Sequence, residues 1–212
     1  MTAKKKKTAI FIVTVMVLIT AIAIVSIRTV RDYLRESYEE IERQILLSTH
    51  PILYSELVEK YANEWNNELD IYFIYAVIKT ESDFNPNAVS SADARGLMQL
   101  TEDTFDWISR YRFFEPELEF DIMFDPETNA RFGTWFLSYL YDSYTDRNAV
   151  IAAYHAGYYA VREWLQDERY TRDGIHLIVE NIPIADTRHY VNKVNNAYNN
   201  YIKLYVTQTE RN

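Results

Sequence analysis

One carboxylate in this sequence stands where an acid could be kept protonated. Glu81 follows Ile74, Val77 and Ile78 by seven, four and three residues, so on a helix it would share their apolar face. It also lies at the C-terminal end of that predicted helix, where the helix dipole disfavours a negative charge. Burial and dipole both raise a carboxyl pKa and prepare the group to donate a proton near neutral pH. On periodicity alone, the simpler interpretation is that the helix ends here and Glu81 turns into solvent.

Four blocks of sequence stand in order from this carboxylate onward. Residues 81–86 read ESDFNP, 96–100 read GLMQL, 152–157 read AAYHAG and 182–191 read IPIADTRHYV. This order resembles the catalytic region of the Slt-type lytic transglycosylases, relatives of goose-type lysozyme, and residues 125–133 match a weaker block. In that family a Glu-Ser pair ends one helix and Gly-Leu-Met-Gln opens the next. The resemblance covers residues 70–205, and four ordered blocks are far more specific than any one.

The resemblance implies a site in which Glu81 is the catalytic residue. The substrate-binding candidates are Ser90, Gln99, Tyr154, His155 and Tyr190. Gln99, expected on the first turn of its helix, offers amide donors and an acceptor to an N-acetyl group or a hydroxyl. Tyr154 can present its ring and hydroxyl, and Tyr190 matches a tyrosine that lies near the glutamate in the family. Gln99 could equally be a surface residue, and Tyr154 and Tyr190 could serve only in packing.

The sequence departs from the family pattern at three places. His155 stands where the family commonly has Asn, and Asp186 stands where it commonly has Glu. Thr101 and Glu102 replace a common Met-Pro pair after the glutamine. These changes bear on substrate contacts and on the pH optimum more than on the reaction itself.

The reaction that the resemblance implies is cleavage of the β-1,4 bond between N-acetylmuramic acid and N-acetylglucosamine in peptidoglycan strands. A 1,6-anhydro ring would form and no water would be consumed, with Glu81 acting alone. No motif places a second acid, because Asp83 is two residues away and would point elsewhere on a helix. The alternatives are a lysozyme-type muramidase that uses Asp83, Asp93 or another acid to activate water, and a non-catalytic peptidoglycan-binding scaffold.

The composition excludes several other classes. The chain has no Cys, which removes disulfides, Cys-ligated metals and a thiol nucleophile, and it has no His-x-x-x-His pair. We therefore expect no metal and no cofactor. Beyond Arg31 the chain holds 16 basic and 31 acidic side chains, a net charge of −15. Such a body is a poor partner for nucleic acid.

An uncharged apolar segment precedes the catalytic blocks. Residues 8–27 read TAIFIVTVMVLITAIAIVSI, which as a helix is long enough to cross a hydrocarbon core of ~30 Å. Four lysines precede it, so the positive-inside rule predicts a cytoplasmic tail at 1–7 and a single-pass anchor in the cell membrane. The catalytic domain would then be extracytoplasmic. A cleaved signal peptide is the alternative, because Ala21-Ile22-Ala23 resembles a cleavage site.

The elements that position the site are predicted to be helices. Only 4 Gly argue against a many-turned β fold, and 32 aromatic residues can supply a core. We expect an all-α, lysozyme-like domain at 51–206, following the transmembrane helix, a helical stalk at 28–50 open to protein partners, and a tail at 207–212. Helices are expected at 55–65, after Asp70, and at 96–110, 126–143, 147–166 and 187–205, with a polar loop at 82–95 and an ambiguous segment at 175–180.

Overall fold

The computed structural model describes residues 3–65 and 69–206, and the chain divides into two units at Met1–Thr49 and His50–Asn212. Within the described ranges every regular element is helical, and the only β pairing is three isolated bridges. The all-α prediction is therefore confirmed. The predicted tail at 207–212 lies outside the described residues.

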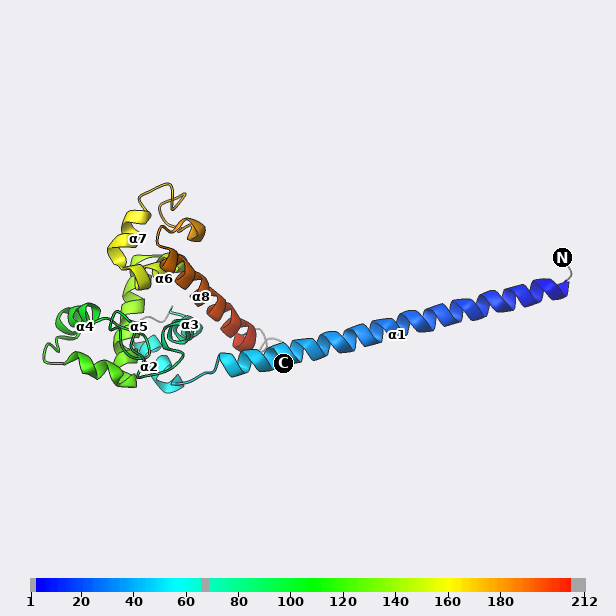
Figure 1. Ribbon diagram of the computed structural model, residues 1–212, viewed down its shortest axis with the longest axis horizontal. Coiled ribbons are helices and arrows are strands. Elements are labelled where there is room, and N and C mark those ends of the chain that lie inside the picture. Colours follow the sequence, from blue (N-terminus) through cyan, green and yellow to red (C-terminus); the bar gives the residue numbers. More distant parts are fainter. Residues whose placement is uncertain (1–2, 66–68, 207–212) are drawn as a thin grey trace. The chain divides into compact units, whose positions relative to one another are not determined.

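The first unit is a single helix, α1 (Ala3–Thr49). Figure 1 draws it as an uninterrupted rod in blue to cyan. Its segment Lys6–Thr49 contains a stretch long and apolar enough to cross a membrane, judged by length and composition. The predicted anchor and the predicted stalk are thus successive parts of one helix, because no Gly or Pro interrupts the sequence between them.

The second unit contains seven α-helices among its described residues. They are α2 (Ser55–Trp65), α3 (Ile71–Ser82), α4 (Glu102–Ile108), α5 (Pro126–Ser143), α6 (Arg147–Ala156), α7 (Tyr158–Trp164) and α8 (Ala185–Tyr201). Side-chain caps fix the starts of three of them, α3, α5 and α6, the last through Asp146, which accepts from the amides of Asn148 and Ala149. The Asp70 carboxylate accepts from the Tyr72 amide before α3, and Asp125 accepts from the Thr128 amide before α5.

Two helix predictions were wrong at their boundaries. The helix expected from residue 96 begins at Glu102, because Gly96 and Gln99 have φ of 79° and 49°, which no right-handed helix can continue. The helix expected over 147–166 is broken at Gly157, whose φ is 89°. The ambiguous segment at 175–180 is not a strand; a short 3₁₀ turn, Val179–Asn181, lies at its end.

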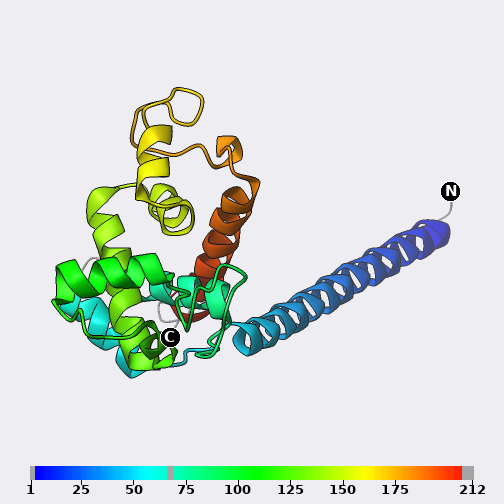
Figure 2. The same cartoon turned by 60° about the vertical axis from the view of Figure 1, so that its left-hand side comes forward.

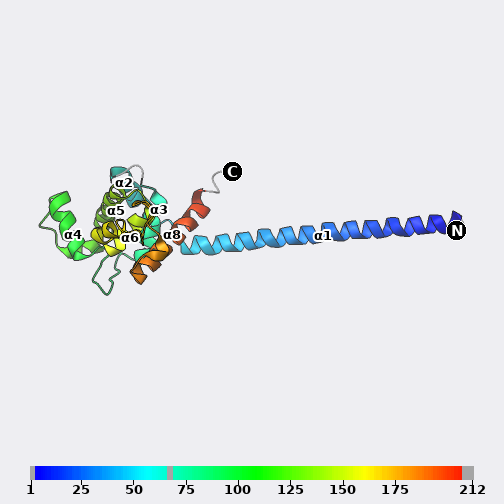
Figure 3. The same cartoon turned by 90° about the horizontal axis from the view of Figure 1, so that it is seen from above.

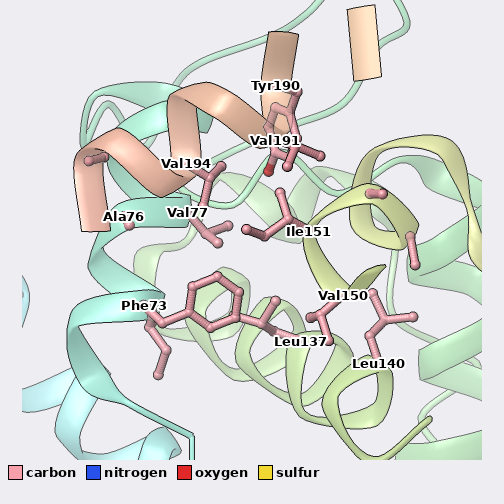
Figure 4. Close-up of a cluster of buried hydrophobic side chains, with 14 of the residues drawn as sticks. Phe73, Ala76, Val77, Leu137, Leu140, Val150, Ile151, Tyr190, Val191 and Val194 are labelled. Carbon is pink, nitrogen blue, oxygen red and sulfur yellow. The ribbon is translucent and has the colours of Figure 1, made fainter. Parts of the chain in front are cut away.

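The main core lies where α3, α5, α6 and α8 meet. In Figure 4 Phe73 and Val77 of α3 point toward Leu137 of α5, Ile151 of α6 and Val194 of α8. Helix α3 buries residues 73–78 in one unbroken run, so it is surrounded on all sides. Figure 2 shows α8, in orange to red, running beside this core.

A second, smaller core lies under α4. Its buried members are Leu100, Phe105, Ile108, Phe120, Met123 and Phe132. Figures 1 and 3 both place α4 on the side of the domain away from α8. The loop at 96–101 joins the two cores, since Leu97 and Met98 belong to the first and Leu100 to the second.

Candidate active site

Glu81 lies on the last turn of α3. The helix ends two residues later, where Asp83 adopts the left-handed conformation with φ of 51° and its amide donates to the Lys79 carbonyl. The Glu81 side chain is neither fully buried nor exposed. It therefore lies at the edge of the main core, the place where a group can be desolvated and still reach a ligand.

One hydrogen bond joins Glu81 to a helix that is distant in sequence. The Tyr190 hydroxyl, on α8, donates to Glu81 Oε1 over 2.5 Å. Tyr190 is buried, and burial together with the nearby Glu81 raises the pKa of its phenol well above the ordinary value. The phenol therefore stays neutral and remains a donor. This contact brings together the first and last of the sequence blocks.

Burial raises the pKa of the Glu81 carboxyl from 4.5 to about 7. The hydrogen bond from Tyr190 acts in the opposite direction, because it favours the ionised form, but its effect is the smaller one. No charged group among the described residues contributes to this shift. The carboxyl is accordingly a mixture of acid and carboxylate near neutral pH, as a group that must both donate and accept a proton requires.

The 96–101 loop, whose Leu97 carbonyl accepts from the Ser82 hydroxyl, is held by Asn129 of α5. Asn129 is fully buried; its Oδ1 accepts from the Met98 amide at 2.8 Å, and its Nδ2 donates to the carbonyls of Arg95 and Met123, both at 2.9 Å. A Cβ at Gly96 would collide with the Asn129 side chain and with the Met123 carbonyl. The close approach of loop and asparagine therefore requires glycine at position 96.

Ser82 connects the end of α3 to the same loop. Its hydroxyl donates to the Leu97 carbonyl at 2.7 Å, fifteen residues along the chain. The Glu-Ser pair thus has two distinct functions in this fold. Glu81 carries the titrating group, and Ser82 fixes the loop relative to it.

Gln99 is in this loop and not on a helical turn, which corrects the prediction. Its side-chain amide donates to the carbonyls of Ala88 and Gly96, at 2.9 and 3.0 Å. Those two bonds support a backbone that is left-handed at Gln99 itself. In this conformation the amide donors that we assigned to substrate are engaged with the loop.

Ser90 has a similar structural role in the preceding loop. Its hydroxyl accepts from the amides of Ala92 and Ala94, at 3.2 and 3.1 Å, and the residue is exposed. These bonds form a local turn of the kind that serine commonly makes. The structure therefore explains Ser90 without a ligand, and its predicted contact with substrate stays a prediction.

Tyr154 and His155 lie on the last turn of α6, on two sides of the site. The Tyr154 hydroxyl donates to the Met98 carbonyl at 2.7 Å, and burial, reinforced by Glu81, raises the pKa of its phenol well above the ordinary value. The His155 ring lies 4.7 Å from the Tyr190 ring, and its Nδ1 is 3.0 Å from Oγ1 of the fully buried Thr187. Burial lowers the pKa of the imidazole, and Asp186 partly opposes this.

The two carboxylates considered as a second acid are both paired elsewhere. Asp83 forms an ion pair with Lys79, and Asp93 forms one with Arg95 at 2.9 Å. Both aspartate side chains are mostly exposed, at 73% and 57%. Neither of them affects the pKa of Glu81. The five predicted residues thus divide: Tyr190, Tyr154 and His155 cluster at Glu81, whereas Gln99 and Ser90 stabilise the loops.

Three residues that position the site were not among those predictions. They are Ser82, Asn129 and Thr187. All three belong to the sequence blocks, so block membership was the available signal. Their functions, however, depend on contacts with residues 15, 31 and 32 positions away.

The comparison with protein families decides the assignment. Residues 58–177 match the family model described as "Transglycosylase SLT domain", which is more than half of the chain. The chain belongs to this family. Tyr190 lies beyond the matched residues, so its hydrogen bond to Glu81 is an observation of the structure alone.

Known proteins of this SLT family are similar in sequence and in fold. The membrane-bound lytic murein transglycosylase C of Pectobacterium atrosepticum is 34% identical over 171 residues, which cover 70% of this chain and 46% of that protein. The crystal structure of the 70 kDa soluble lytic transglycosylase of Escherichia coli matches with a TM-score of 0.68 at 31% identity, over 76% of this chain and 26% of that one. An inactive glutamate-to-glutamine mutant of the Pseudomonas aeruginosa enzyme Slt matches with a TM-score of 0.63 at 30% identity, over 73% and 25%.

These matches confirm the predicted lysozyme-like SLT fold. The chain spans about half the length of the curated relative or less, so the likeness concerns the SLT domain and not the whole of those proteins.

Gly133 provides a test of how tightly the loop packs on α5. A Cβ at this position would collide with the Met98 side chain, so Gly133→Ala should lower the free energy of unfolding by about 1–3 kcal/mol. Urea unfolding of the detergent-solubilised chain measures it. Ser143→Ala, at the exposed end of the same helix, should change it by less than about 0.5 kcal/mol. Equal stability of Gly133→Ala and the parent would show that the loop is not so confined.

Glu81→Gln should remove a pH-dependent loss of stability. The folded state holds the Glu81 proton up to about pH 7, whereas the unfolded chain releases it near 4.5. This stability is present below the lower value and is lost as pH rises through the upper one, in total about 3 kcal/mol. The free energies of unfolding at pH 5 and at pH 8 should therefore differ less in Glu81→Gln than in the parent. Glu117→Gln, at an exposed position, controls for the lost charge; equal pH dependence in Glu81→Gln and the parent would contradict the raised pKa.

Proposed function

We propose that this chain cleaves the β-1,4 bond between N-acetylmuramic acid and N-acetylglucosamine in peptidoglycan without consuming water, with Glu81 as the single acid and base. The observation that carries the proposal is the Glu81 carboxyl itself, with a pKa of about 7 and a phenol bound to one of its oxygens. The printed names of the relatives, lytic murein transglycosylases, support the substrate and the reaction class.

The hydrogen bond from Tyr190 supports different roles for the two oxygens of the Glu81 carboxyl. In the neutral acid, Oε1 accepts the phenol hydrogen and is the carbonyl oxygen, so the proton resides on Oε2. Oε2 then gives this proton to the glycosidic oxygen as the bond to the muramic C1 breaks. The Tyr190 bond strengthens as Glu81 becomes a carboxylate, which stabilises the charge that this step creates.

The second half of the reaction uses the same group as a base. The oxocarbenium-like centre at the muramic C1 is stabilised by the substrate's own N-acetyl group. The C6 hydroxyl then attacks C1, and Glu81 takes its proton, which restores the neutral acid and closes the 1,6-anhydro ring. Every atom of the substrate stays in the two products, so no water enters the balance.

The rival hydrolase needs a second carboxylate to serve as nucleophile or to activate water. Such pairs lie roughly 5–9.5 Å apart in glycoside hydrolases. Asp83 and Asp93 are each engaged with a basic side chain, which speaks against this use. The inactive glutamate-to-glutamine mutant of the related Pseudomonas aeruginosa enzyme further supports catalysis by one glutamate over a binding scaffold.

We place the catalytic unit outside the cell. The proposed anchor is residues 8–27 of α1, the lysines before it stay in the cytoplasm, and the SLT domain from residue 51 onward faces the peptidoglycan. The membrane-bound name of a relative supports membrane association. In this arrangement the anchor keeps the enzyme close to its substrate without a strong ionic attraction.

The products of digestion test the reaction. The detergent-solubilised chain, incubated with purified peptidoglycan, should release muropeptides with anhydro ends, lighter by one water than reducing ends, as read by mass spectrometry. Glu81→Gln should lose activity by about 10²–10⁴-fold, because it can neither donate nor accept the proton.

Asp83→Asn and Asp93→Asn are the matched controls and should retain most activity. Products with reducing ends only would identify a hydrolase. Undiminished activity of Glu81→Gln would instead exclude the catalytic role of Glu81.

A further inference from the structure

From the last residue of the proposed anchor onward, α1 carries an apolar stripe with an 11-residue repeat. The residues Ile27, Val30 and Leu34 recur eleven positions later as Tyr38, Ile41 and Ile45, and these six side chains are 48–70% exposed. An 11-residue repeat corresponds to 3.67 residues per turn, close to the natural value of the α-helix. The stripe therefore runs nearly straight along one face of α1.

The edges of the stripe follow the same repeat. One edge is made of serines 26, 37 and 48, and the other carries Arg31 and Glu42. The opposite face of the helix is charged and includes Asp32 and Glu36. The apolar stripe, the serine edge and the charged edge thus all repeat every 11 residues. Such a shared repeat is typical of helices that pair along their length.

We propose that a second copy of this chain covers the stripe, as a parallel pair of α1 helices in register. The inference rests on the proposed membrane topology. Anchors in one bilayer hold Ile27 of both copies at the same level and send both helices out in the same direction. A pair with two-fold symmetry then brings each stripe residue against its own counterpart.

The charged edges are compatible with this pairing. In a parallel pair, the edge on one side of the stripe faces the opposite edge of the second helix, as g faces e in heptad coiled coils. Arg31 and Glu42 therefore face the serine edge of the second copy and not their own counterparts. Like charges are not brought together, and the small serines leave room for close approach.

The stripe is short, so its pairing depends on the membrane that holds the two copies together. The stripe runs from Ile27 to Ile45, 19 residues that span about 27 Å, only about five turns. Only six apolar side chains of each helix would be buried along it, so the gain from pairing in water is small. Two anchored copies, however, meet at the high effective concentration that confinement provides. The pair should accordingly exist in the membrane and be lost in dilute detergent.

Cysteine cross-linking tests the pair cleanly, because the natural chain has no cysteine. Leu34→Cys and Ile41→Cys lie on the stripe, and Asp32→Cys and Glu36→Cys are matched controls on the opposite face. The full chain is expressed, and isolated membranes are oxidised. A disulfide requires Cα atoms within roughly 7 Å, so the stripe variants should give a dimer of the chain and the controls none.

Leu34→Glu, added to the Ile41→Cys chain, should abolish the dimer while the chain stays in the membrane. Cross-linking from both faces alike, from neither face, or to proteins of other mass would each overturn the proposed pair. A chain that alkaline washing removes from the membrane would overturn the topology and the pair with it. Glu81→Gln, added to the Ile41→Cys chain, should cross-link as Ile41→Cys alone does, so a failure of the proposed catalysis is recognised separately.

Discussion

The desolvation of one carboxyl group is the constraint on which the rest of the site depends. Glu81 has to lie against the core for its pKa to reach about 7, yet it has to face outward to meet a ligand. The last turn of a helix whose middle, residues 73–78, is buried satisfies both needs. Tyr190 then gives the carboxylate form of Glu81 a hydrogen-bond partner, without which a desolvated carboxylate would be costly.

The remaining elements hold the surroundings of that group rigid. Met98 is fixed from both sides, since its amide donates to Asn129 and its carbonyl accepts from Tyr154. Ser82 adds a third attachment at Leu97. Fixed polar groups around a reacting centre need little reorganisation during the reaction, which is where much of the catalytic power of enzymes originates.

Local signals were sufficient for most of the fold, and contacts between distant residues were not predictable. The Asp70 cap and the apolar spacing before Glu81 led to the position of α3, and the helix expected at 126–143 coincides with α5. The left-handed backbone at Gln99 escaped prediction because it depends on the Ala88 carbonyl eleven residues away. The family resemblance predicted that Tyr190 lies close to Glu81. Periodicity alone would have predicted only a packing role for Tyr190.

The hydroxyls and amides that line the loops are mostly occupied by the protein's own main chain, as Gln99 and Ser90 illustrate. Exchanging these side chains in order to change ligand recognition would first remove the hydrogen bonds that hold the loops. The selectivity of such a site depends more on its shape and on main-chain groups than on these side chains. Redesign would accordingly have to reshape the backbone path, a harder task than swapping polar residues.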